Sequence, residues 1–90
     1  MANLQPDVFD IVQAYGGKKV AYVEFNAVTA ADVMQFADSG VAGIKHMDLR
    51  QDTDGAFVLG VIAGASDVDI TVGAGPAAVK VTGTIMWRSY

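Results

Sequence analysis

The stretch KVAYVEFNAV, residues 19–28, sets the fold class of this chain. Every second position in it is apolar: Ala21, Val23, Phe25 and Ala27. The positions between them are of mixed character. Because successive side chains of a β-strand point to opposite faces, this alternation predicts a strand with one side on a core.

Further alternating runs follow. Residues 41–49 alternate more weakly and place His46 on one face with Ala42 and Ile44, while DVDITV (67–72) and AAVKVTGTIMWRSY (77–90) alternate cleanly. QDTDG (51–55) has the Asp and Gly chemistry of a tight turn and predicts a hairpin. Its return arm, AFVLGVIA (56–63), is apolar on both faces, which predicts a strand covered on both sides. We expect that arm at the centre of the core or of a subunit contact.

Two segments remain open from the residues alone. The apolar positions within residues 4–15 fit a short helix and a strand equally well. Thr29 and Asp32 resemble a capping box, which favours two helical turns with Val33, Met34 and Phe36 inward. The alternative is a turn at 29–32 and a short strand to Phe36. With no internal repeat or linker, residues 1–90 form a single domain: mostly β, a small antiparallel β-sandwich or barrel with at most one short helix.

The composition predicts self-association. The chain has 90 residues, of which 52% are hydrophobic, 18% are charged and none is cysteine. An average soluble domain is roughly 25% charged. Area scaling predicts roughly 5,000 Å² of folded surface for this mass, so the core is small and disulfides are not available to support it. We therefore expect some apolar surface to lie against another molecule.

The net charge and the length of the uncharged stretches limit the classes of partner that we expect. The formal net charge of −4 argues against nucleic acid, and beyond the adjacent Lys18 and Lys19 the cations are scattered. The first ten residues lack the cationic start and apolar region of a secretory signal. The longest uncharged stretch, residues 55–66, is shorter than the roughly 18 residues of a membrane span. We expect neither nucleic acid nor membrane as a partner.

Catalytic motifs are weak. His46 is the only histidine, and no serine lies in a G-x-S-x-G elbow, so a site built on His46 and Asp48 is the weaker interpretation. Asp48, Asp52 and Asp54 crowd one turn, but the calcium-loop register fails around Gly55. The G-x-G-x-x-A of residues 73–78 contains Pro76 and precedes a strand, so it is interpreted as a turn. We expect no catalytic residue, no metal and no cofactor.

The large side chains of the apolar arm and of the two chain ends are the candidates for intermolecular contact. They are Phe9, Tyr15, Phe57, Leu59, Trp87 and Tyr90.

A resemblance narrows the function. The Thr29–Asp32 turn, AFVLGVIAG, DVDITVGAGPAAVKV and the closing TGTIMWRSY look like the small accessory virion proteins of tailed bacteriophages. The match covers roughly residues 26–90. It implies a β-sandwich or barrel that oligomerises on the capsid exterior as a decoration (cement) protein, or that sits in the neck or tail.

The resemblance implies that the protein is located in the virion after assembly in the host cytoplasm. Copies of the chain, as a dimer or trimer, and the major capsid or other virion proteins would be its partners, with no catalytic residues. Residues 1–16 are a possible N-terminal arm. The alternative from another class is a small carbohydrate- or surface-binding β-module, which predicts an exposed aromatic platform at Trp87 or Tyr22.

Overall fold

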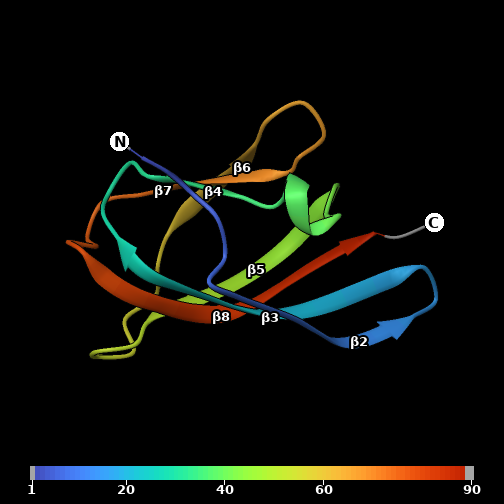
Figure 1. Cartoon of the computed structure of the whole chain (residues 1–90), viewed down its shortest axis with the longest axis horizontal. Helices are drawn as coiled ribbons and strands as arrows, with labels where there is room; N and C mark the ends of the chain where they lie inside the picture. The colour runs from blue at the N-terminus through green and yellow to red at the C-terminus, as the bar shows by residue number, and fades with distance from the viewer. Residues whose placement is uncertain (1, 89–90) are drawn as a thin grey trace.

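Two four-stranded β-sheets pack face to face in the computed structural model, which describes residues 2–88 (Figure 1). The small sheet has the order β1 (Asn3–Leu4), β4 (Val33–Gln35), β7 (Asp69–Val72), β6 (Gly60–Ala63). The large sheet has the order β2 (Val8–Tyr15), β3 (Lys18–Val28), β8 (Val79–Arg88), β5 (Ile44–Gln51). The predicted β-sandwich is confirmed. Within residues 2–88 the one helical element is a 3-10 turn, η1 (Ala37–Ser39).

Neighbouring strands are antiparallel, as predicted, except that β1 and β4 run parallel. The core lies between the sheets and takes its largest side chains from both, including Phe25 of β3 and Met34 of β4. Phe25 meets Phe36 edge-on, with ring centroids 5.7 Å apart. The accessible surface is 4905 Å², close to the value expected from the mass.

The decisive strand is confirmed, with one correction. Ala21, Val23 and Phe25 are buried as expected, but Ala27 is exposed and Val28 is buried in its place. The register of β3 on β8 shifts between Phe25 and Val28. A β-bulge inserts one residue and so reverses the inward and outward positions beyond it.

A second bulge corrects the prediction for residues 41–49. The strand begins at Ile44, and its register on β8 shifts between Ile44 and His46. Ile44 and Leu49 are buried, whereas His46 is exposed opposite Met86. His46 therefore does not share the face of Ile44, and that prediction was wrong.

The two open segments both resolve as strands. Residues 3–4 and 8–15 form β1 and β2 within the two sheets. Residues 29–32 make a turn closed by the Asp32 N–H donating to the Thr29 carbonyl, and β4 follows, so the helical alternative was wrong. The Asp32 carboxylate is buried and accepts from the backbone N–H groups of Thr29 (2.9 Å) and Ala2 (2.8 Å).

The return arm of the predicted hairpin crosses from one sheet to the other. The turn at 52–54 is present, but Phe57 keeps a single bridge to Arg50, and only Gly60–Ala63 form a strand, β6, in the small sheet. Val58 is buried, while Phe57, Leu59 and Val61 are exposed. A strand covered on both sides was therefore the wrong expectation: the arm has one side on the core and one facing outward.

The last two predicted strands are confirmed as β7 and β8. Ile70 and Val72 of β7, and Val81, Ile85 and Trp87 of β8, are buried, and residues 73–78 form the loop between these strands, as interpreted from the sequence. Gly83, at the middle of β8, lies so close to β5 that a Cβ on it would overlap the Asp48 carbonyl oxygen. The absence of a side chain here permits the central pairing of the large sheet.

Candidate interaction surface

Three large apolar side chains project outward from one short segment. Phe57, Leu59 and Val61 are 63%, 71% and 66% exposed. Val58, between the first two, is buried, and Ile62, directly after the third, packs against the core, so the alternation of the chain divides this segment into an inner and an outer row. We call Phe57, Leu59 and Val61 the apolar row. A rigid, fully apolar row at the surface is typical of a contact surface for another macromolecule.

Two neighbours fix the apolar row in place. The Arg50 guanidinium carbon lies 4.3 Å from the centroid of the Phe57 ring, a cation–π contact. Gly60 packs so tightly that a Cβ on it would lie 2.8 Å from Ile70 Cγ2 and 3.3 Å from Met47 Cε. The backbone of β6 is therefore held down on the core, and its apolar side chains are presented on a rigid support.

The predicted contact residues divide into three groups. Phe57 and Leu59 lie in the apolar row. Phe9 and Trp87 instead pack against each other, with ring centroids 5.9 Å apart, and Trp87 is only 4% exposed. Tyr15 is the last residue of β2, opposite Lys18, and Tyr90 lies outside the described residues. Val61 was not among the contact residues predicted from the sequence. Its position two residues after Leu59, on the same apolar arm, is the signal that could have identified it.

Strand β2 also carries exposed apolar side chains. Val8, Ile11 and Val12 are 40%, 46% and 52% exposed. The register of β2 on β3 shifts between Ile11 and Gln13, so Val12 sits in a bulge. Val8 pairs with Glu24 and Ile11 with Ala21, two residues of β3 that point to opposite faces, so these side chains do not form one surface. They are also more covered than the apolar row and are therefore the weaker candidate for contact.

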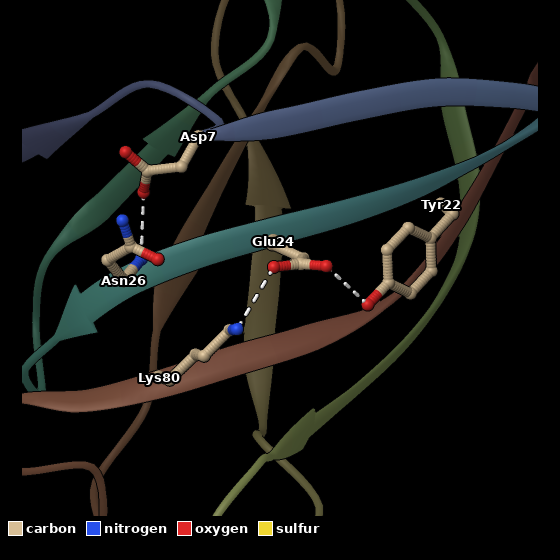
Figure 2. A network of polar contacts seen from close by, with 5 residues as sticks. All are labelled: Asp7, Tyr22, Glu24, Asn26 and Lys80. Atoms are coloured by element: carbon tan, nitrogen blue, oxygen red, sulfur yellow. Dashed lines mark hydrogen bonds and ion pairs between the residues drawn. The ribbon is translucent and has the colours of Figure 1, made fainter.

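The outer face of the large sheet carries a polar network (Figure 2). The Tyr22 hydroxyl donates to Glu24 Oε2 (2.8 Å), and Lys80 Nζ lies 3.1 Å from Glu24 Oε1. Asp7 Oδ2 accepts from the backbone N–H of Asn26 (2.8 Å). Because Tyr22 and Glu24 belong to β3 and Lys80 to β8, the network fixes neighbouring strands to each other.

The charges of this network stabilise one another. The hydrogen bond from Tyr22, and after it the one from Lys80, lowers the pKa of Glu24. The same bond to Glu24 raises the pKa of Tyr22, and Glu24 raises the pKa of Lys80. At neutral pH the Glu24 carboxylate is therefore ionised, and the Tyr22 phenol and the Lys80 ammonium are protonated. These charge states hold the two strands together, whereas a general acid or base would need a pKa near neutral pH.

Beside the network lies a shallow groove of about 230 Å³ between β3, β8 and β5. It is lined by Tyr22, Asp48, Arg50, Thr82, Gly83 and Thr84. Asp48 and Arg50 form a partly exposed ion pair, with Arg50 Nε 3.6 Å from Asp48 Oδ1. The groove combines one aromatic ring with several hydrogen-bonding groups, a set suited to orienting a small polar molecule.

Cations that are scattered in the sequence meet at the end of the large sheet. Lys18 of β3 lies directly opposite Arg88 of β8, and both line, with Lys45, Met86 and Trp87, a hollow of about 130 Å³. Like charges directly opposite each other on neighbouring strands are unfavourable. This cationic hollow was missed because strand register, which brings the three cations together, is not visible in their spacing along the chain.

The acidic turn and the single histidine do not gather into a site. Asp52 and Asp54 are exposed at the tip of the 51–55 turn, where Asp54 Oδ1 accepts from the Ala56 N–H (3.0 Å). Residues 2–88 contain no group of three or more His, Cys, Asp or Glu side chains placed to hold a metal ion. No helix in that range is long and apolar enough to cross a membrane.

Comparisons of the chain with known proteins found no matching family, no matching curated protein and no matching solved structure.

Proposed function

We propose that this chain is a non-enzymatic structural protein of a tailed-phage virion, a decoration (cement) protein that stabilises the shell through contacts with copies of itself and with the major capsid protein. The observation that carries the proposal is the apolar row, Phe57, Leu59 and Val61, each more than 60% exposed on one rigid segment. The resemblance of residues 26–90 to accessory virion proteins supplies the biological setting.

Physical reasons favour a contact role for the row. Apolar surface removed from water contributes roughly 25 cal/mol per Å². A row of three large side chains makes that contribution at low entropic cost, because Gly60 and Val58 already hold the backbone on the core. A two-sheet sandwich is also a stiff spacer, which suits a protein that reinforces a shell.

Labelling of particles tests the proposal. An antiserum raised against the purified chain, followed by gold labelling of phage particles released by cells that carry the gene, should decorate the shell. Label confined to the neck or tail would support the alternative place on the particle. Unlabelled particles, with the protein left in the soluble fraction of a density gradient, would overturn the proposal.

A second candidate function is a small carbohydrate-binding module, favoured by the groove beside Tyr22. Because Trp87 is buried, any aromatic platform would depend on Tyr22. At about 230 Å³ the groove is smaller than the roughly 300–1,000 Å³ of typical ligand pockets, which limits it to one sugar ring. Titration calorimetry with monosaccharides tests this function: binding lost in Tyr22→Ala would support it, and no heat with any sugar would exclude it.

A further inference from the structure

The sandwich has four edge strands, and three of them carry features that hinder pairing with another chain. Strand β1 has two residues. Strand β2 has a bulge at Val12 and carries Asp10, and β5 has a bulge at Lys45 and carries Asp48 and Arg50. Short length, bulges and charges are the usual protections of a sheet edge.

Strand β6 is four residues long but has neither a bulge nor a charge. Its residues are Gly60, Val61, Ile62 and Ala63, with no charge and no proline, and its pairing with β7 is regular from end to end. The Leu59 carbonyl accepts from the Gly73 N–H, which sets the alternation along this ladder. The backbone groups of residues 59, 61 and 63 therefore point to β7, and those of Gly60 and Ile62 point outward to the open edge.

We propose that β6 is a self-pairing edge: two copies of this chain join antiparallel along β6, about a two-fold axis through Val61, and continue the small sheet from one copy into the other. Four-stranded sheets of the two copies then form one eight-stranded sheet. The contact is isologous, as expected of a symmetric dimer. This inference rests on the proposed function in one respect: it specifies the contact between copies of the chain that the proposed function requires.

The backbone selects that register. With Val61 opposite Val61, Gly60 of each copy faces Ile62 of the other, so every outward N–H of these residues meets a C=O. One of the two neighbouring registers would place Ile62 opposite Val58. The Val58 N–H is not free to pair there, because it already donates to the Leu49 carbonyl (2.9 Å). The other neighbouring register would place Gly60 opposite Gly64, which lies in the turn after β6 and not in an extended strand.

The side chains agree with the same register. Val61 meets Val61, and Leu59 meets Ala63, so each exposed apolar side chain of the strand finds an apolar partner. Phe57 lies outside this pairing, because it is bridged to Arg50 of β5 in the large sheet. Apolar pairing along the edge fits a second copy of this chain.

Cysteine cross-linking tests the register directly, because the chain has no cysteine of its own. Residues at a non-hydrogen-bonded antiparallel position have Cα atoms about 4.5 Å apart, within the range that a disulfide spans. Val61→Cys should therefore form a disulfide-linked dimer under mild oxidation. Leu59→Cys and Ala63→Cys should each form no disulfide-linked dimer alone and should form a mixed disulfide when combined.

A charge at the edge supplies the second measurement. Val61→Lys should raise the dimer Kd in sedimentation equilibrium at least tenfold over the original chain. Val12→Lys is the matched control, since it places the same charge on an exposed valine of the other sheet's edge, and its Kd should stay within twofold.

The outcomes separate this inference from the proposed function. A chain that stays monomeric at millimolar concentration, or Leu59→Cys cross-linking to itself as readily as Val61→Cys, would overturn β6 self-pairing. Gold label on the shell together with that result would leave the virion function standing. A β6 dimer that labels no particle would keep the self-pairing and remove the function.

Discussion

Gly83 shows how one missing side chain shapes the large sheet. A Cβ there would overlap the Asp48 carbonyl oxygen and lie 2.8 Å from Leu49 Cα, and both obstacles are backbone of the neighbouring strand. Gly83→Ala should therefore force β5 and β8 apart and lower the free energy of unfolding by about 3 kcal/mol, as severe overpacking does. Denaturant titration followed by circular dichroism measures the change.

Gly40→Ala is the matched control for that substitution. Gly40 has a left-handed backbone (φ +79°) and nothing within 4 Å of a built Cβ, so only conformational strain opposes the alanine. Its cost should be about 1 kcal/mol. Equal losses for the two variants would show that strain, and not the approach of β5 to β8, explains the glycine at 83.

Asp32 makes a second prediction at this scale. The backbone N–H of Thr29, and after it that of Ala2, lowers the pKa of this buried carboxyl below its ordinary value of 3.8. Because the pKa is lower in the folded state than in the unfolded chain, the stabilisation is complete above pH 3.8 and disappears as the pH falls through the folded value. In Asp32→Asn this part of the acid dependence should vanish, and the Tm near neutral pH should drop by several degrees.

Scanning calorimetry from pH 2 to 7 measures both effects for Asp32. Asp10→Asn serves as control, since Asp10 is an exposed carboxylate on β2 without a hydrogen-bond donor among residues 2–88. It should leave the Tm near neutral pH unchanged. An acid limb that keeps its shape in Asp32→Asn would contradict the assigned role of that carboxylate.

At the scale of elements, alternation was the reliable signal. It identified β3, β7 and β8, because each has one face on the core and a long enough run for the period of two to stand out. It failed at Ala27 and His46, where a bulge adds one residue and exchanges the faces. A bulge is an event between two strands, so the sequence of one strand does not reveal it.

The return arm failed for a different reason. Residues 56–63 are apolar throughout, and such a run is compatible with burial on both sides or with an outward face that awaits a partner. Only the crossing of the chain from β5 to β6 shows which side is open. Phe57 and Leu59 were named from the sequence, but the cationic hollow at Lys18 and Arg88 required the register of β3 on β8.

The polar network gives the prediction that belongs to paired strands. Tyr22 is the largest cause of the lowered Glu24 pKa, ahead of Lys80. Tyr22→Phe should therefore raise the Glu24 pKa toward 4.5 by more than Lys80→Met does, as followed by carboxyl carbon chemical shifts in an NMR titration. A larger effect of Lys80→Met would mean that the ion pair, and not the phenol, dominates.

For the molecule as a whole, the apolar excess of the composition is located in two places. The total surface is that expected for the mass, so the excess is not hidden by unusual compactness. It lies on the apolar row and on the exposed Val8, Ile11 and Val12 of β2. The fold leaves these side chains outside because the small sheet is shorter than the large one and β6 and β2 are edges.

Polar replacement of the apolar row should then leave folding intact. A variant with Phe57→Ser, Leu59→Thr and Val61→Thr, measured at low concentration, should lose less than about 1.5 kcal/mol, since exposed positions contribute about 0.5 kcal/mol each. Leu49→Ala shortens a side chain that is buried in the core and should lower the free energy of unfolding by about 2–5 kcal/mol. A triple variant as unstable as Leu49→Ala would show that the row supports the fold and not a contact.

The position of β8 has a consequence for how the chain acquires its structure. The last strand in sequence order, β8, lies inside the large sheet between β3 and β5, so until it forms β3 is paired only with β2 and β5 has no neighbouring strand in this sheet. A polypeptide interrupted before Val79 would retain two separated ribbons with open flanks and would be prone to proteolysis and aggregation. The large sheet can therefore be completed only once the residues of β8, through Arg88, have been synthesised.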